Sequence, residues 1–289
     1  MIGSALQMRL QGIGHEVVGL TRNASSQNKS TLFHWDPSKG KLDPNALKDT
    51  DGVVHLAGAN IAQGRWTQKR KFELVQSRVE STKLLVESII NSTSPPAWMI
   101  SASAIGIYGD RGDAIVDETT RPNQNFLGNL VTQWAEALIP LKSTPCRTAT
   151  MRFGIVLSPK GGALKTMLPI FKLGGGAVLG SGNQWVSWIS LRDVIGIIEM
   201  ISTHPELSGA FNCVSPNPVN FKEFAKIVGK VIGKPVLLRI PMGIVRLIFG
   251  EMGEATLLSS CKAEPARLLK CGFKFQDPTL ETALNQLLT

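Results

Sequence analysis

Cysteine and tyrosine are both scarce in this chain of 289 residues, which has four cysteines and one tyrosine. The cysteines are Cys146, Cys213, Cys261 and Cys271, and none of them belongs to a C-x-x-C pair. A chain of this length can bury a sufficient core without disulfide bonds. We therefore expect inert thiols in a reduced intracellular protein. No cluster of side chains has the spacing of metal ligands, so no metal site is predicted.

Long hydrophobic runs are also missing. The apolar stretches are too short or too interrupted to span a bilayer, and no basic and apolar leader opens the sequence. We expect a soluble protein without a membrane partner, in the cytoplasm or in the lumen or stroma of an organelle. Hydrophobic residues at 43% and charged residues at 18% argue against extensive disorder.

Acidic residues are fewer than basic ones, 22 against 31, which gives a net charge of +9. This excess suits an anionic ligand such as a nucleotide phosphate, a nucleic acid or an acidic membrane face. The most basic patch comprises Arg65 and residues 69–71, on the exposed side of an amphipathic helix and without interleaved aromatic residues. We therefore expect a solvated helix face and no nucleic-acid partner.

Short apolar runs alternate with helical patterns over the first two-thirds of the chain, as in a parallel sheet covered by helices. Compact apolar runs bounded by turn residues predict strands at Glu16–Leu20, Gly52–Leu56, Ala97–Ser101 and Arg147–Phe153. Helical spacing predicts helices at Gln68–Ile90 and Leu127–Leu141. The predicted fold is therefore α/β, with a Rossmann-like doubly wound parallel sheet.

Capping patterns mark the starts of later helices. Ser190 with Asp193 and Asn220 with Glu223 fit capping boxes, and Asp277 before Pro278 predicts a cap for a last helix. The glycine run 174–176 predicts a loop. Because the pattern becomes mostly helical after residue 234, we predict a main domain at 1–234 and a small C-terminal extension at 235–289.

The opening of the chain resembles the second half of a nucleotide-binding βαβ unit. A helical pattern begins at Met1, followed by the turn at Gly14 and the strand ending near Leu20. In such a unit a first strand and most of a Gly-rich turn come before the helix, so we expect about ten residues of this kind ahead of Met1.

A set of motifs then identifies a family resemblance that runs over essentially the whole chain. Its motifs are His55–Ile61, Gly64–Trp66, Ser77–Val79, Ser101–Gly106, Tyr108–Asp113, Arg152–Leu157, Trp185–Ile189, Phe249–Met252 and Gly272–Phe273. In order and spacing they resemble the epimerase-like short-chain dehydrogenase/reductase proteins, a group of NAD(P)-dependent epimerases and dehydratases with a short C-terminal extension, sometimes labelled cell-division-inhibitor-like. The resemblance implies a sheet that binds NADP or NAD and a small lobe that closes over a substrate cleft.

Several residues match the cofactor positions of this family. Gly3 matches the last glycine of the dinucleotide-binding turn, although a glycine needed only for helix packing is an equal alternative. Thr21 and Arg22 follow the second strand, where NAD-specific proteins place an acid; because Arg22 can pair with a 2′-phosphate, NADP is favoured over NAD. Leu56, Ala57 and Gly58 end a strand at the edge where open α/β sheets bind ligands.

Three further residues are placed near the cofactor by the resemblance alone. They are Glu73, Arg78 and Val156. Arg78 stands where extended relatives usually carry a structural asparagine. The alternative for Glu73 and Arg78 is a pair of ordinary exposed charges on a helix.

The reaction centre departs from the family's pattern. Short-chain dehydrogenases commonly use a serine with a tyrosine and a lysine four residues later, the lysine lowering the tyrosine pKa. Ser103 matches the serine, but Phe126 and Leu130 stand at the aligned tyrosine and lysine positions. Tyr108 is the one tyrosine, and we rank a packing role for it above a role as proton donor.

Two functions remain open. The first is an NADP-dependent oxidoreductase or epimerase that acts on a small carbonyl or sugar-like substrate. The second is a regulatory or scaffold protein that binds NADP without turnover. The missing tyrosine and lysine favour the second function, whereas the family match over the whole chain favours the first. The sequence specifies no oligomeric state.

Overall fold

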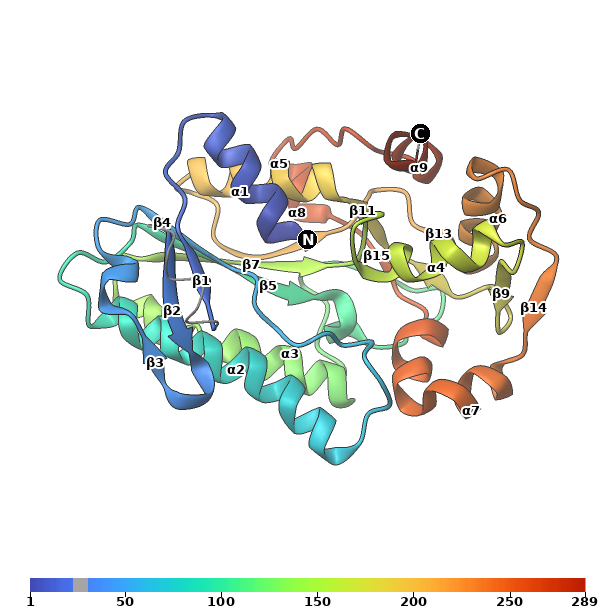
Figure 1. Cartoon of the computed structure of the whole chain (residues 1–289), viewed down its shortest axis with the longest axis horizontal. Coiled ribbons are helices and arrows are strands. Elements are labelled where there is room, and N and C mark those ends of the chain that lie inside the picture. The colour runs from blue at the N-terminus through green and yellow to red at the C-terminus, as the bar shows by residue number, and fades with distance from the viewer. Residues whose placement is uncertain (23–30, 289) are drawn as a thin grey trace.

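The computed structural model describes residues 1–22 and 31–288, and its centre is a parallel sheet of four strands in the order β12-β7-β5-β4 (Figure 1). These strands are β4 (Gly52–His55), β5 (Trp98–Ala104), β7 (Arg147–Phe153) and β12 (Gly209–Cys213). Strands β5 and β7 pair in register along their full lengths. The expected parallel α/β fold is therefore confirmed.

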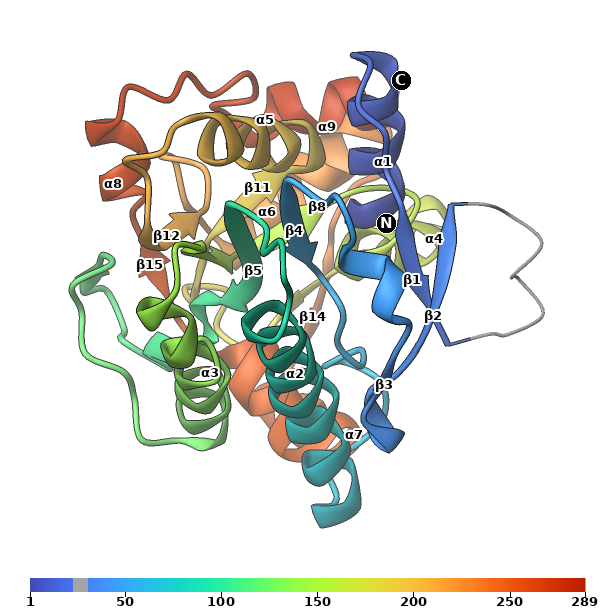
Figure 2. The same cartoon turned by 90° about the vertical axis from the view of Figure 1, so that its left-hand side faces the viewer.

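A second sheet lies beyond β4, on the side away from β5 (Figure 2). Its strands are β1 (Gly19–Thr21), β2 (Leu32–Asp36) and β3 (Lys41–Leu42), in the order β1-β2-β3. The pair β1 and β2 is parallel, like the central strands. No ladder joins β1 to β4 in the described residues, so the predicted single sheet consists of two hydrogen-bonded parts.

Helices cover both faces of the central sheet. Figure 1 shows α1 (Ile2–Gly12) and α5 (Leu191–Thr203) above it, with α2 (Gln68–Ile90) and α3 (Phe126–Glu136) below. On the first face Leu6 and Ile198 pack against Ile100 of β5, and all three side chains are buried. On the second face α2 packs through Leu85 and Ile89 against β5. This double cover explains why the central strands are nearly continuous apolar runs.

The two crossover helices on the second face differ in how well the sequence predicts them. The bounds of α2 agree with the prediction, and the Thr67 hydroxyl caps its first turn by accepting from the Arg70 amide. The predicted helix at Leu127–Leu141 is wrong at its end, because α3 stops at Glu136 and a 3-10 turn follows. Pro140 explains the break, since a proline ring clashes with the carbonyl four residues earlier.

The strand predictions are right in place and differ in length. The first strand starts at Gly19 and not at Glu16, and the third extends to Ala104. The extension is supported by β7, which pairs with β5 as far as Phe153. Strand length is therefore set by the neighbouring strand as well as by local sequence.

A second cluster of helices and short strands follows β7 and lies at the right of Figure 1. Its core joins α4, α6 and α9 through buried side chains that include Leu168, Phe224 and Leu284. Its elements are β8 (Ile155–Leu157), α4 (Gly162–Lys172), β9 (Ala177–Leu179), β10 (Trp185–Val186), β11 (Trp188–Ser190), β13 (Val219–Asn220), α6 (Phe221–Val231), β14 (Leu238–Ile240) and α9 (Leu280–Leu288).

The remaining elements lie within or between these two parts. They are β6 (Ile115–Val116), α7 (Met242–Gly253), β15 (Lys262–Ala263), α8 (Ala266–Lys270), the 3-10 helices Pro37–Lys39, Pro44–Leu47, Ile105–Tyr108 and Ile139–Ser143, and a π-helical turn at Glu254–Leu258. Within α7, Gly250 has φ 59° and breaks the helical conformation. Glycine suits this position because residues with a side chain rarely adopt a positive φ. The glycine run 174–176 is a loop, as predicted.

Two of the three predicted helix caps are confirmed. The Ser190 hydroxyl accepts from the Asp193 amide, and the Asn220 side chain accepts from the Glu223 amide. The predicted cap at Asp277 is wrong. Its carboxylate pairs with Arg192 at 2.7 Å, and α9 begins only at Leu280, where Thr279 accepts from the Thr282 amide. The Asp277 carboxylate is bound by Arg192, which is distant in sequence. A local sequence pattern could not predict this ion pair.

Among residues 1–22 and 31–288, no helix has both the length and the apolar composition that a membrane crossing requires.

Candidate functional site

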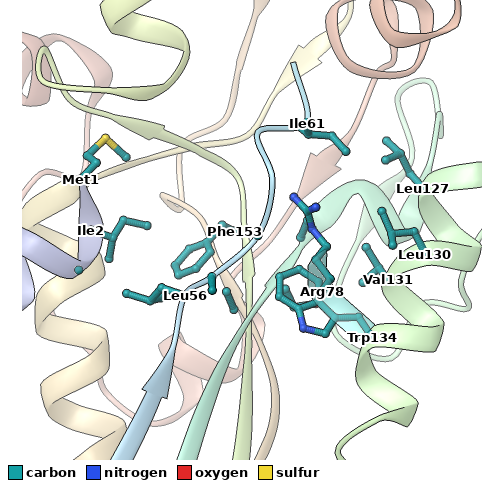
Figure 3. Close-up of a pocket in the computed structure, with 16 residues that line it drawn as sticks. Met1, Ile2, Leu56, Ile61, Arg78, Leu127, Leu130, Val131, Trp134 and Phe153 are labelled. Atoms are coloured by element: carbon teal, nitrogen blue, oxygen red, sulfur yellow. The ribbon is translucent and has the colours of Figure 1, made fainter. Parts of the chain in front are cut away.

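A cavity of about 380 Å³ lies at the carboxyl ends of β4 and β5, between the N-terminus of α1 and the side of α3 (Figure 3). This is the edge at which open parallel sheets bind ligands. The lining residues are Met1, Ile2, Gly3, Leu56, Ala57, Gly58, Ile61, Arg78, Ala102, Ser103, Ala104, Leu127, Leu130, Val131, Trp134 and Phe153.

Four of the residues predicted to bind a cofactor line one end of this cavity. Gly3 sits in the first turn of α1, and a Cβ added there would lie 3.9 Å from the Leu56 side chain. Leu56, Ala57 and Gly58 follow directly after β4. A Cβ on Gly58 would lie only 3.2 Å from Cζ of Arg78, so the glycine leaves room for the guanidinium. Small residues thus keep the backbone open to the cavity.

Arg78 is the one charged residue among the described residues that line the cavity. It extends from α2 towards the centre of the cavity in Figure 3, and it donates to the carbonyl oxygens of Ala59 at 2.9 Å and Leu74 at 3.1 Å. Its guanidinium lies over the ring of Trp134, 5.4 Å from the centroid. In the described structure no carboxylate forms an ion pair with it.

Burial, together with the smaller effect of the nearby cation of Arg70, lowers the pKa of Arg78 from 12.5 to about 10. Since this pKa remains well above 7, the guanidinium is charged at neutral pH. A partly buried cation without a carboxylate partner is a suitable contact for an anionic ligand.

Ser103 lies at the carboxyl end of β5 and lines the cavity. Because strand side chains alternate, Ser103 shares a sheet face with Met99, which packs against Leu85 of α2. Its hydroxyl therefore lies on the same side of the sheet as Arg78. No hydrogen bond from another described residue occupies this hydroxyl. It is free to bond a ligand.

The aligned tyrosine and lysine positions are occupied by side chains that cannot exchange a proton. Leu130 is 2% exposed and lines the cavity. Phe126 packs edge-on against Trp66, with ring centroids 5.0 Å apart, and lies outside the lining. This part of the cavity wall is therefore apolar.

Tyr108 is fully buried and lies outside the cavity lining. Its hydroxyl donates to the Asn212 side chain at 2.6 Å and accepts from Arg152 at 2.7 Å. Burial raises its pKa above the usual value of 10. These contacts support the packing role, since both hydrogen-bonding positions of the hydroxyl already have protein partners.

Besides Tyr108, four residues predicted to lie near the cofactor are not brought into the cavity lining. Glu73 is on α2 and pairs with Arg70 at 3.0 Å. Val156 is a partly buried residue of β8 that packs with the core beneath α5. Thr21 ends β1, and Arg22 follows it with an exposed side chain. Arg22 therefore lies at the carboxyl end of a parallel strand, where it can meet a part of a ligand that extends beyond the cavity.

The basic patch predicted as a solvated helix face makes contacts within the molecule. Arg65 donates to the carbonyl oxygen of Leu247, and Lys71 pairs with Glu251 at 2.7 Å. Arg70 donates to the Asn60 carbonyl oxygen and to Glu73. Arg65 and Lys71 thus hold α7 against the loop before α2 and against the start of α2 itself. No group of three His, Cys, Asp or Glu side chains suited to a metal ion occurs in residues 1–22 and 31–288.

Sequence reasoning missed most of the cavity wall on the α3 side. The missed residues are Ile61, Leu127, Val131 and Trp134. The helical spacing of Leu127, Val131 and Trp134 places them on one buried face of α3, and this signal was present in the sequence. Such a stripe indicates burial, but it does not distinguish a core contact from a cavity wall.

Comparison with known proteins places the chain in a family. The model of the NAD dependent epimerase/dehydratase family matches residues 1–213, and a domain of unknown function, DUF1731, matches residues 240–287. Epimerase family protein Mb2239 of Mycobacterium bovis is 39% identical over 289 residues, which is 100% of this chain and 95% of that protein.

Solved structures agree with this assignment. The crystal structure of human epimerase family protein SDR39U1 (isoform 2) with NADPH has a TM-score of 0.92 and 31% identity, covering 99% of this chain and 95% of that one. A nucleoside-diphosphate sugar epimerase from Corynebacterium glutamicum has a TM-score of 0.81 and 31% identity, covering 100% of this chain and 56% of that one. The family match over most of the chain and these relatives over its whole length show that the protein belongs to the NAD dependent epimerase/dehydratase family.

Proposed function

We propose that the chain binds NADP(H) in the cavity and acts on a small carbonyl or sugar-like substrate as an oxidoreductase or epimerase of the short-chain dehydrogenase/reductase type. The observation that carries the proposal is Arg78, a cation without an acidic partner in a cavity at the carboxyl edge of the sheet. The human relative crystallised with NADPH supports the choice of cofactor.

The residues of the cavity fit such a cofactor. The first turn of α1 faces the cavity through Ile2 and Gly3, and its free amides and the helix dipole favour phosphate there. Gly58 leaves the loop after β4 open, so that a ligand can approach the backbone. Arg78 would bind a phosphate or ribose oxygen, and Arg22 would bind the 2′-phosphate that distinguishes NADP from NAD.

The chemistry of the site is divided between cofactor and protein. A bound nicotinamide supplies or accepts a hydride. Ser103 would orient the substrate by donating a hydrogen bond from its hydroxyl to the reacting oxygen. The apolar side chains around it exclude water and so strengthen that hydrogen bond.

A second candidate is a regulatory or scaffold protein that binds NADP(H) without turnover. Leu130 favours it, because this buried side chain faces the cavity at the position of the family's lysine. Without a tyrosine and lysine at these positions, the described lining residues include no side chain of a type that exchanges protons near neutral pH.

Replacing Ser103 by alanine separates the two candidates. If the chain is an enzyme, it consumes NADPH with a member of a panel of carbonyl compounds, and Ser103→Ala lowers kcat/KM by about 10²-fold or more, as loss of an oxyanion donor does. The measurement is NADPH absorbance during turnover. NADPH binding without consumption by any panel member would instead support the regulatory protein.

Arg22→Asp tests the preference for NADP over NAD. The carboxylate repels a 2′-phosphate and accepts a hydrogen bond from a 2′-hydroxyl, so NADPH affinity should fall about tenfold or more and NADH affinity should rise. Titrations of both cofactors into both proteins measure the ratio. Arg9→Asp, at an exposed arginine on α1 that pairs with Glu199, is the matched control and should leave the ratio unchanged. An unaltered ratio in Arg22→Asp would exclude this residue from the cofactor site.

A further inference from the structure

The cavity has two unlike ends on either side of Arg78. Figure 3 shows Met1, Ile2 and Leu56 on one side, and Leu127 and Leu130 on the other. The first end carries the helix terminus and the glycines that suit a cofactor. The second end, which we call the α3 wall, consists of Ile61, Leu127, Leu130, Val131 and Trp134.

The α3 wall offers a ligand apolar surface. Ile61, Leu127, Leu130 and Val131 have aliphatic side chains. The indole N–H of Trp134 is the single polar group on these side chains, and it already donates to the Thr82 hydroxyl at 2.9 Å. Hydrogen bonds along α3 occupy most of its backbone amides. A hydroxyl group placed against this wall would lose its bonds to water and gain few in return.

Packing behind the wall prevents its side chains from turning away. Leu127 and Leu130 belong to a buried cluster with Trp66 and Met252, the latter from the C-terminal region. Leu130 and Val131 are each 2% exposed. The wall is therefore a fixed apolar surface, and polar groups from elsewhere in the protein cannot replace it without unpacking this cluster.

Few polar side chains remain for a substrate. Among the described lining residues, Ser103 has the one hydroxyl, and the guanidinium of Arg78 already donates to the carbonyl oxygens of Ala59 and Leu74. With Arg78 assigned to the cofactor, Ser103 remains to bond one substrate oxygen. A hexose ring has several hydroxyl groups, and most of them would be unpaired here.

We infer that the substrate is an apolar carbonyl compound, or the corresponding alcohol, whose hydrocarbon part lies on the α3 wall and whose single oxygen bonds to Ser103. This inference rests on the proposed function and narrows its substrate class to ketones and aldehydes with aliphatic or aromatic groups. Sugar nucleotides, which the name of the Corynebacterium relative suggests, are disfavoured for this chain.

Binding to the cofactor-loaded protein tests the inference without relying on turnover. The probes are 2-naphthaldehyde, a flat apolar carbonyl compound, and UDP-glucose, each titrated into the protein saturated with NADPH. Quenching of tryptophan fluorescence reports occupancy because Trp134 is part of the wall. We expect saturable binding of 2-naphthaldehyde, with a negative heat-capacity change by calorimetry, and at least about tenfold weaker binding of UDP-glucose.

Leu130→Asn is the corresponding variant and should weaken 2-naphthaldehyde binding to the NADPH-saturated protein about tenfold. Leu247→Asn, at a side chain 75% exposed on α7, is its control and should leave 2-naphthaldehyde binding unchanged. If Leu130→Asn fails to fold, comparing the affinities of the two probes for the unaltered chain still tests the inference about the substrate class. Tighter binding of UDP-glucose than of 2-naphthaldehyde would overturn the inference, whereas failure to saturate with NADPH would count against the proposed function.

Discussion

Arg78→Met should weaken NADPH binding about 10- to 100-fold. Hydrogen bonds to charged groups contribute about 1.5–3 kcal/mol, and each 1.4 kcal/mol corresponds to about tenfold in affinity. Methionine keeps most of the apolar stem but lacks the guanidinium that lies over Trp134, so the change removes mainly the charge and the donors. Fluorescence titration of NADPH measures the effect.

Two further variants show whether the charge of Arg78 causes the loss. Arg78→Lys keeps the charge but not the planar fork, so its affinity should lie between those of the unaltered chain and Arg78→Met. Arg246→Met removes an exposed arginine that pairs with Glu254, and it should leave the affinity unchanged. Equal NADPH affinity in Arg78→Met and the unaltered chain would show that Arg78 does not bind the cofactor.

Gly128→Ala should destabilise the protein by about 3 kcal/mol, the upper part of the usual range for overpacking. An added Cβ would lie 1.8 Å from the carbonyl oxygen of Asn123, so the backbone has to move. Gly128 also donates its amide to the Asn125 side chain that caps α3. The shift would displace the α3 wall and weaken binding of an apolar ligand as well. Chemical denaturation measures the loss in the free energy of unfolding.

Gly243→Ala is the matched control with the opposite expected sign. Gly243 lies within α7, and an added Cβ there meets no atom within 4 Å. Alanine should stabilise the helix by about 0.5–1 kcal/mol, because it reduces the conformational entropy lost on folding. Similar changes in stability from the two substitutions would show that the close contact at Gly128 has no energetic consequence.

The sequence predicts elements well where the signal is local. The bounds of α2 follow from helical periodicity, and the sheet follows from short apolar runs between helices. The end of α3 was mispredicted because apolar residues continue past the point where Pro140 blocks the helix. The hydrophobic pattern thus continues beyond the last residue of the helix.

The candidate site is also predictable only where its residues belong to local sequence motifs. Motifs identified Gly3, Gly58 and Ser103, and the structure brings all three to one cavity. The cap at Asp277 failed because Arg192 binds its carboxylate across the fold. The lack of a carboxylate partner for Arg78 also depends on tertiary structure. Only the folded chain shows which charges remain without an ion-pair partner.

Equilibrium titration of NADPH into the purified chain, with NADH as the comparison, measures whether this cavity binds a pyridine nucleotide. We expect saturable binding of one equivalent of NADPH, tighter than that of NADH, and weaker in Arg78→Met. A chain that is folded by circular dichroism and yet takes up neither nucleotide to saturation would contradict this expectation.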